Sequence, residues 1–533
     1  MSPKDSLVQA LSPEDAAHPG FNPRTVVDDE LNLQIDYDTT IVLRDGSKIY
    51  ADVYKPSKLS KYPTILVWTP YGKHVNPFHR WNNLTGSVVP TNILSKYVAF
   101  ETPDPGFWCE NGYAVVIVDP QSQDCYDTIE WAGTQEWSQG NVGMTGVSYL
   151  AWSQWRVAAL NPPHLKAINP NEGVTDFYRE LAHHGGINSP FIKGIIETQW
   201  GYGRNQIEDL TRLTDAHPLF DDYWKSKNPD LSAIKVPAYV VASWGDFGLH
   251  TRGTLEGFKK ISSTEKWLRV HGRRKFPSFY EDQERQRQFF DKFLKGLDSE
   301  VDYWPKVNLE IRERYYIGNY RAEQEWPLAR TKYTKLFLDS EKQTMKLESS
   351  PKSHKAEYDV SNAPGFTEKL EFDYVLPVDT ELTGHFKLRL WVEAQGNDDM
   401  DIFVEIDKID RTGDKVPFPW RTLSADGPVA GGWLRVSHRE LDEELTTPHQ
   451  PVHKHTRELN LKPGEIVPVD IEIWPASILC RKGKRIRLTL KGSDPHPGHN
   501  PNFTHPGTLN TGTHIVHTGC SYDSHLLVPE IPV

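Results

Sequence analysis

The chain has 533 residues, too many for one hydrophobic core, so we expect two or three domains. It is 38% hydrophobic and 25% charged, and its net charge of −12 argues against nucleic acid or an anionic membrane as a partner. The N-terminus lacks the apolar core of a signal peptide, and no apolar run reaches the ~18 residues of a membrane-spanning helix, so a cytoplasmic protein is expected. The four cysteines form no C-x-x-C pair, which excludes a common zinc spacing and gives no disulfide framework.

The N-terminal half alternates strand and helix patterns after a polar arm, residues 1–31. "LRDGSKIYADVYKP" predicts a hairpin that turns at Asp45 and Gly46. "YPTILVW" and "GYAVVIVD" are continuous β-branched runs, typical of strands buried on both faces of a parallel sheet. "DCYDTIEWAGTQEW" and "YLAWSQWRVAALNPP" predict helices, and "HLKAINP" and "KVPAYVVASW" predict further strands. This alternation indicates an α/β domain, which we assign to residues 32–170 and 235–300.

Two further segments of the chain have different residue patterns. Residues 171–234 are helix-prone and rich in aromatic residues, and they interrupt the sheet strands, so we expect a helical cap inserted over the domain. Residues 301–533 hold many short alternating runs separated by Gly, Pro and Asp turns, such as "FKLRLWVEA", "DIFVEIDKID" and "VPVDIEIWP". This pattern predicts an antiparallel β-sandwich or jelly roll.

Ser148, in "GNVGMTGVSYL", is the first candidate functional residue. A short strand precedes it and an apolar helix follows, and this strand-turn-helix context exposes a serine hydroxyl at the top of a sheet. Gly146 leaves room for the tight turn, although Leu150 stands where the full G-x-S-x-G signature has its second glycine. A second G-x-S-Y sequence ends at Tyr522, but its serine, Ser521, lies between two extended segments and is expected to be structural.

A serine nucleophile needs a base, and the base needs an acid that orients it. Asp246 follows an apolar strand in "VVASWGDFGLH", where such an acid is expected; a turn aspartate is the alternative. His271 ends the next strand, in "KWLRVHGRRKF", and is the predicted base; His250, four residues after Asp246, is its rival.

The predicted oxyanion hole combines two donors. One is the backbone N–H of Tyr149, and the other is the phenolic hydroxyl of Tyr71, in the "WTPYGKH" loop after an early strand. An ordinary pocket aromatic is the alternative for Tyr71. The sequence predicts no cofactor and no metal site.

Several motifs in order resemble the Xaa-Pro dipeptidyl-peptidase and cocaine-esterase family of serine hydrolases. They are "DGSKIYADVYKP", "TPYGK", "GYAVVIVD", "DTIEW", "GNVGMTGVSYL", "SWGDFGLHTRG", "QRQFFDKFLKG" and "GWLRVSHRELD". The resemblance implies an α/β-hydrolase domain with an inserted helical cap, followed by an all-β jelly-roll domain of the galactose-binding-like kind. It places the nucleophile at Ser148, the acid at Asp246 and the oxyanion tyrosine at Tyr71.

The chain departs from the family in two places. The loop after Asp119 is some twenty residues shorter than the resemblance leads us to expect, and a gapless match puts Lys275 where relatives have the catalytic histidine. The expected function is a serine hydrolase that cleaves a small ester or peptide through an acyl-enzyme. The alternative is an impaired family member that acts as a binding module. A peptidase would need acidic residues that bind the free ammonium of its substrate, and Glu172, Asp176 and Glu180 are the candidates. A homodimer is a further possibility that the sequence leaves open.

Overall fold

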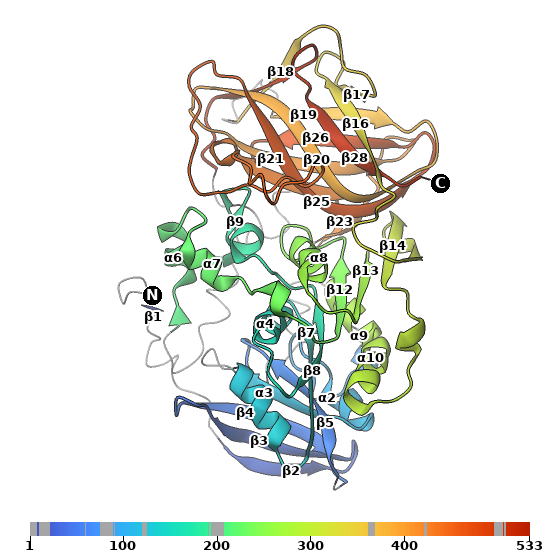
Figure 1. The fold of residues 1–533 in the computed structure, drawn as a ribbon. Coiled ribbons are helices and arrows are strands. Elements are labelled where there is room, and N and C mark those ends of the chain that lie inside the picture. The colour runs from blue at the N-terminus through green and yellow to red at the C-terminus, as the bar shows by residue number, and fades with distance from the viewer. Residues whose placement is uncertain are drawn as a thin grey trace.

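The computed structural model describes residues 8–9, 22–58, 60–74, 89, 91–119, 125–189, 191–192, 207–360, 368–420, 424–494, 505 and 508–532. A part built of strands and helices, blue to yellow-green in Figure 1, lies end to end with a strand-rich C-terminal part, yellow to red. Most of the predicted arm and residues 120–124 of the shortened loop fall outside the described residues.

One mostly parallel sheet forms the N-terminal part. Its strand order is β2-β3-β4-β6-β5-β7-β8-β12-β13-β14-β15, and the pairs from β6 to β14 are parallel. The predicted hairpin is confirmed, with Val42 opposite Lys48 across the turn. The strands are β2 (Arg24–Asp28), β3 (Leu33–Val42), β4 (Lys48–Pro56), β5 (Tyr62–Trp68), β6 (Ala114–Asp119), β7 (Ser138–Val147), β8 (Leu165–Asn171), β12 (Ala238–Ser243), β13 (Lys266–His271), β14 (Val307–Arg314) and β15 (Ile317–Glu323).

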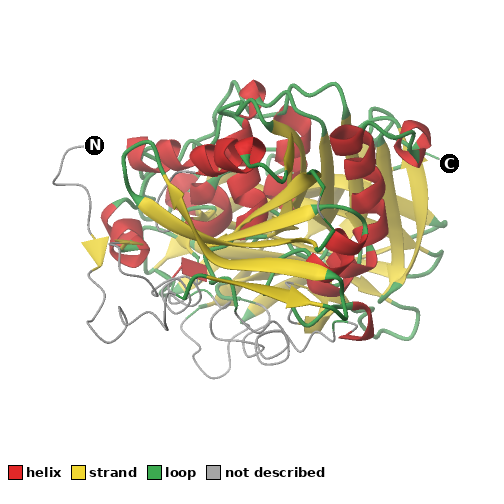
Figure 2. Ribbon diagram, turned by 90° about the horizontal axis from the view of Figure 1, so that it is seen from below, coloured by secondary structure: helices red, strands yellow, loops and turns green. Residues whose placement is uncertain are grey.

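Helices cover both faces of this sheet (Figure 2). The apolar side chains of α3, α4 and α8 pack in one buried cluster, and those of α2, α9 and α10 pack in another. The predicted alternation of strands and helices is thus confirmed. The helices are α2 (Pro105–Glu110), α3 (Cys125–Thr134), α4 (Tyr149–Ala158), α8 (Thr251–Lys260), α9 (Lys275–Glu281) and α10 (Gln283–Lys295), with short turns η1 (Thr91–Ile93) and η5 (Glu300–Tyr303).

The segment between β8 and β12 folds over the C-terminal ends of the parallel strands. Its described part has its own apolar cluster, in which Trp224 is fully buried. It mixes helices with short strand pairs: η2 (Tyr178–Ala182), β9 (His183–His184), β10 (Ile187–Asn188), β11 (Ile207–Glu208), which pairs with β1 (Val8–Gln9), α6 (Leu210–Ala216), α7 (Asp222–Lys227) and η4 (Leu231–Ala233).

The C-terminal part is built of antiparallel strands around one large apolar core. The 16-residue β20 pairs along one edge with β25, and along the other with β28 and then β27. Strands β19, β26, β21 and β24 pair in that order. The bounds are β16 (Lys332–Asp339), β17 (Thr344–Lys346), β18 (His354–Asp359), β19 (Lys369–Val375), β20 (Thr380–Gln395), β21 (Asp401–Ile409), β22 (Phe418–Trp420), β23 (Ser424–Gly427), β24 (Ala430–Arg435), η6 (Val436–His438), β25 (Val467–Cys480), β26 (Arg485–Lys491), β27 (Thr513–Thr518) and β28 (His525–Glu530).

The C-terminal part packs against the loop that follows β12. Phe247 of this loop stacks on Trp420 with ring centroids 5.7 Å apart. A Cβ on Gly245 would lie 2.4 Å from the carbonyl oxygen of Pro419, so only glycine allows this close approach. The two parts of the chain are therefore packed tightly against each other at the loop that holds Gly245 and Phe247.

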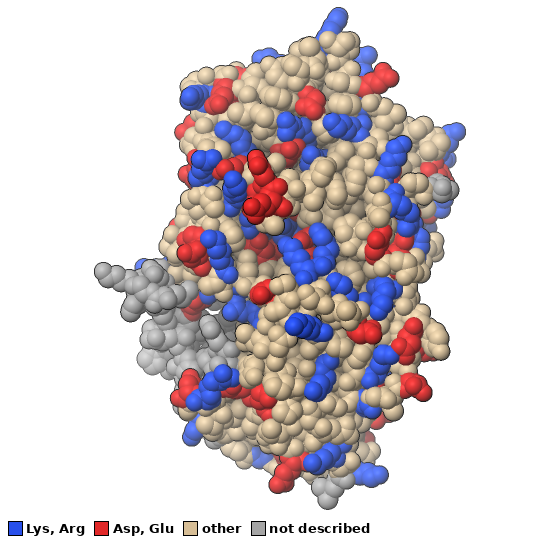
Figure 3. Space-filling view, in the orientation of Figure 1, with Lys and Arg blue, Asp and Glu red and all other residues tan. Residues whose placement is uncertain are grey.

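The charges on the surface and the character of the helices agree with a sequence that is 25% charged and has no long apolar run. On the face shown in Figure 3, side chains of both charge signs are interspersed. None of the helices in the described ranges combines the length and the apolar character that crossing a membrane requires.

Candidate active site

Ser148 occupies a strained turn between β7 and α4. Its φ of 62° and ψ of −115° lie in a region that non-glycine residues avoid, at a cost of about 1–3 kcal/mol. The turn is held on both sides: the Ser148 N–H donates to the carbonyl oxygen of Asn171 at 3.1 Å, and its own carbonyl oxygen accepts from the N–H of Trp152 at 3.0 Å. The predicted strand-turn-helix is thus present, and it lifts the hydroxyl above the end of the sheet.

Gly146 makes room for this turn. Its φ is +149°, and a Cβ there would lie 2.6 Å from Cβ of Leu150, the residue that replaces the second glycine of the elbow signature. Leu150 therefore fills the space that the missing side chain at 146 leaves. This contact explains why position 146 requires glycine.

Changing Gly146 to alanine is expected to lower the free energy of unfolding by about 2 kcal/mol or more, because the added methyl group must displace Leu150 and with it the start of α4. Urea unfolding followed by tryptophan fluorescence would measure this. Gly413→Ala is the matched control, since Gly413 also has a positive φ, +101°, but nothing lies within 4 Å of its added Cβ. An equal loss in both variants would show that crowding at Leu150 is not the cause.

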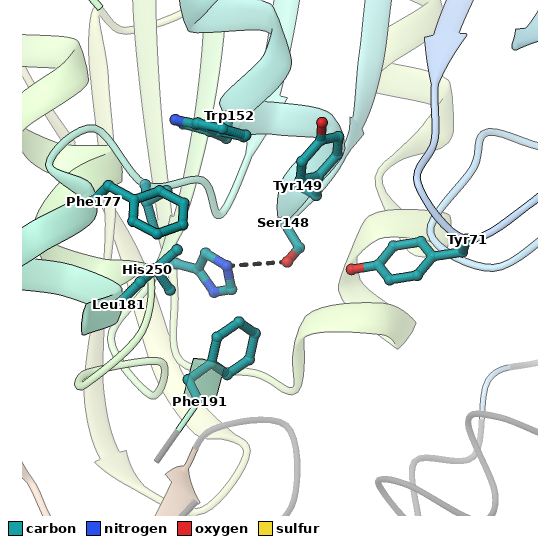
Figure 4. Close-up of a pocket in the computed structure, with 9 residues that line it drawn as sticks. Tyr71, Ser148, Tyr149, Trp152, Phe177, Leu181, Phe191 and His250 are labelled. Atoms are coloured by element: carbon teal, nitrogen blue, oxygen red, sulfur yellow. Dashed lines mark hydrogen bonds between the residues drawn. The ribbon is translucent and has the colours of Figure 1, made fainter. Parts of the chain in front are cut away.

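His250 is the imidazole that meets Ser148. Its Nε2 lies 3.1 Å from Ser148 Oγ (Figure 4). Its Nδ1 lies 2.5 Å from Asp246 Oδ2. Asp246 and His250 are four residues apart, and the Asp246 carbonyl oxygen accepts the His250 N–H at 3.0 Å, so one tight turn before α8 brings the carboxylate under the ring. With its hydrogen on Nδ1, the imidazole offers the Nε2 lone pair to the serine hydroxyl.

The prediction that His271 reaches Ser148 is wrong. His271 is the last residue of β13 and pairs with Ser243 of β12, so its backbone is still held in the sheet. Its Nε2 lies 3.3 Å from Glu172 Oε1, and its Nδ1 accepts the N–H of Arg273 at 3.1 Å. Both ring nitrogens are thus engaged elsewhere.

Burial and charge set the protonation of the site. Burial, and then the nearby Lys275 ammonium, lower the pKa of His250 to about 4, although Asp246 opposes them. Burial alone would raise the pKa of Asp246, but Lys275 and His250 hold it well below its usual range. At neutral pH the site therefore holds a neutral imidazole and an ionised carboxylate, as a general base requires.

The two residues predicted to supply the oxyanion donors, Tyr71 and Tyr149, both line the pocket beside Ser148. Tyr71 is 8% exposed, its ring packs edge-on against Phe100, and its hydroxyl points toward Ser148 in Figure 4. The amide of Tyr149 is the first of α4, at the positive end of the helix dipole. The Tyr149 phenol points away from Ser148 Oγ.

A pocket opens beside the serine and encloses about 310 Å³ of space, including the part open to solvent. Its described lining contains no Asp, Glu, Lys or Arg. The lining residues are Tyr71, Ser148, Tyr149, Trp152, Val174, Phe177, Leu181, Phe191 and His250. In the part of the chain that the structure describes, no cluster of three His, Cys, Asp or Glu side chains is arranged to hold a metal ion.

The three acidic residues considered for an ammonium lie outside this lining. Glu172 faces His271, Asp176 pairs with Arg179 at 2.7 Å, and Glu180 pairs with Arg252 at 2.9 Å. Each carboxylate therefore already has a positive or hydrogen-bonding partner within the protein.

Sequence reasoning underrated His250 and assigned no role to Lys275. The signal for His250 was the Asp-x-x-x-His spacing just before a helix, which puts both side chains on one turn. Hydrolases of unrelated folds activate a serine hydroxyl through this same series of imidazole and carboxylate. The fold and this series define a serine hydrolase.

Comparison with known proteins gives the same class. The family model described as X-Pro dipeptidyl-peptidase (S15 family) matches residues 45–273, and that of the X-Pro dipeptidyl-peptidase C-terminal non-catalytic domain matches residues 299–527. A crystal structure of a CocE/NonD family hydrolase from Staphylococcus aureus is 42% identical, covers 94% of each chain and superimposes with a TM-score of 0.88. The chain belongs to the CocE/NonD family of hydrolases.

More distant relatives share the sequence or the fold. The cocaine esterase of Rhodococcus sp. (strain MB1 Bresler) is 26% identical over 370 residues, which are 58% of this chain and 62% of that esterase. The matched segment thus spans less than two thirds of that relative. An α-amino acid ester hydrolase is 15% identical with a TM-score of 0.68, which shows a common fold alone.

Proposed function

We propose that this protein hydrolyses esters of small, neutral, apolar acyl groups through an acyl-enzyme on Ser148. The observation that carries the proposal is the hydrogen-bonded series from Ser148 Oγ through His250 to Asp246, of which Ser148 and His250 line an apolar pocket. We also assign the architecture to an α/β-hydrolase domain with an inserted cap and a C-terminal jelly roll, which the sheet order and the family match support.

In the proposed mechanism, His250 Nε2 takes the hydroxyl proton while Ser148 Oγ bonds to the ester carbonyl carbon. The tetrahedral oxyanion accepts hydrogen bonds from the Tyr71 hydroxyl and the Tyr149 N–H. The His250 imidazolium, stabilised by Asp246, then returns the proton to the leaving alcohol. Water repeats the sequence on the acyl-enzyme and releases the acid.

The preference for a neutral acyl group follows from the lining of the pocket. A peptide or amino acid ester with a free α-ammonium would have to bury that charge against aromatic and aliphatic side chains, because the candidate carboxylates lie elsewhere and are paired. Burying a charge without a partner is costly. An ester with a hydrocarbon acyl group has no such cost.

Two 4-nitrophenyl esters test this preference, since 3-phenylpropanoate and phenylalanine esters differ by one amino group. We expect kcat/KM at neutral pH to be at least about tenfold higher for the phenylpropanoate, and an Xaa-Pro 4-nitroanilide to be turned over more slowly still. Faster hydrolysis of the amino acid ester or of the Xaa-Pro amide would replace the esterase proposal with a peptidase or amino acid ester hydrolase.

A further inference from the structure

A buried lysine lies behind the proposed catalytic series. Lys275 is the first residue of α9, and its side chain is 4% exposed. Its Nζ lies 2.8 Å from Asp246 Oδ2 and 2.9 Å from His250 Nδ1, while those two atoms are 2.5 Å apart. Ammonium, carboxylate and imidazole thus lie at the corners of a triangle, whereas the proposed mechanism uses only the carboxylate and the imidazole.

The ammonium has a different effect on each of its two neighbours. An ammonium group has donors and no acceptor, and the hydrogen on His250 Nδ1 is directed at Asp246, so Lys275 donates to the Asp246 carboxylate and not to Nδ1. This bond holds the carboxylate oxygen in place beside the ring. The same positive charge disfavours a second positive charge on the imidazole. Lys275 therefore favours the ionised form of Asp246 and the neutral form of His250.

Charged groups from several elements face Lys275 and keep it protonated. Burial alone would lower the pKa of Lys275, but Asp246 after β12, Glu172 after β8 and Glu101 before α2 raise it. His271 lies behind Glu172, at 3.3 Å from its carboxylate. The ammonium is therefore a constant charge over the pH range in which a histidine titrates.

We propose that Lys275 is a positioning residue that fixes Asp246 against His250 and disfavours the imidazolium, so that His250 stays a neutral base in mildly acidic solution. This inference rests on the proposed function of Ser148 and His250. It also explains a departure from the family, because the ammonium stands at the position where the resemblance placed the catalytic histidine. A base that resists protonation becomes a stronger acid once it holds the serine proton, which favours expulsion of the alcohol.

The test is the acid limb of the pH profile of kcat/KM for a neutral ester. The pKa of His250, about 4, puts the midpoint of the wild-type acid limb near that pH, with activity lost as pH falls through it. Lys275→Met removes the opposing charge and leaves Asp246, so the midpoint should move to higher pH by about one unit or more. Lys408→Met, which removes another buried lysine in the C-terminal part, should leave the midpoint unchanged.

Lys275→Met leaves Asp246 and Glu172 buried without their cation, so Lys275→Met/Glu172→Gln provides a second variant with a better charge balance. NMR titration of isotope-labelled His250 in the Ser148→Ala background, with and without Lys275→Met, reports protonation without activity. An unchanged acid limb and an unchanged titration midpoint in folded variants would overturn the role of Lys275. Absence of ester hydrolysis by the wild type would instead overturn the proposed function, and the NMR titration would still decide on Lys275.

Discussion

Changing Ser148 to alanine is expected to lower kcat/KM for ester hydrolysis by about 10⁴-fold or more, because no acyl-enzyme can form. The same change should abolish covalent labelling by a fluorophosphonate, which reacts with an activated serine. The backbone should be little affected: the hydroxyl's hydrogen bond in the described structure is to His250, and alanine removes only one oxygen from a side chain that is 7% exposed. We therefore expect the unfolding midpoint to stay close to that of the wild type.

The chain contains its own control for this experiment. Ser521 also stands in a G-x-S-Y sequence, but it lies in a turn where the N–H of Tyr522 donates to the carbonyl oxygen of Gly519 at 2.9 Å. A strand precedes this turn and another follows it, with no helix N-terminus at the serine. Ser521→Ala should keep full labelling and activity. Labelling that persists in Ser148→Ala would remove Ser148 from the role of nucleophile.

The difference between these two serines shows which parts of the fold could be predicted from local patterns. A serine that follows a buried strand and precedes an amphipathic helix can be recognised from neighbouring residues, because both elements have distinct periodicities. Asp246 is predicted in the same way, as the first carboxylate after an apolar strand. These predictions depend on short stretches of chain, in which sequence distance and spatial distance agree.

Other features depend on contacts that no local pattern contains. The partners of β20 change along its length, from β28 to β27, because strands more than a hundred residues downstream return to the same edge. The runs that form β20 and β25 predicted strands, but nothing in them predicted that the two would pair over almost their whole length. Likewise, only the folded chain brings Pro419 against Gly245.

The sequence favours His271 over His250 as the partner of Ser148 because a rule about strand ends is given more weight than local geometry. His271 satisfied that rule, since it ends a strand adjacent to the one that precedes Asp246. The rule does not consider in which direction the side chain points, and therefore whether it can contact the serine. His250 lies beyond the end of β12, in the turn that starts α8, so its backbone is not held in the sheet. Its ring can therefore lie between Ser148 and Asp246.

Alanine at each of the two histidines should therefore have very different effects. We expect His250→Ala to lower kcat/KM for a neutral ester by about 10³-fold or more, because Ser148 loses its general base and the acyl-enzyme loses the base that activates water. His271→Ala should retain kcat/KM within about tenfold, since that ring contacts Glu172 and the Arg273 amide and not the serine.

The two variants are a matched pair, because both remove a buried imidazole that lies beside a carboxylate. The loss of stability that comes from removing such a group should therefore lower the unfolding midpoint in both variants. Only the loss of the base should lower the rate of turnover by the folded protein. Measuring the folded fraction of each variant by circular dichroism and tryptophan fluorescence would correct each rate for it. If His271→Ala lost as much corrected activity as His250→Ala, the imidazole next to Ser148 in this structure would not be the sole base. The assignment of His250 would then have to give way to one in which the Glu172–His271 pair takes part in proton transfer.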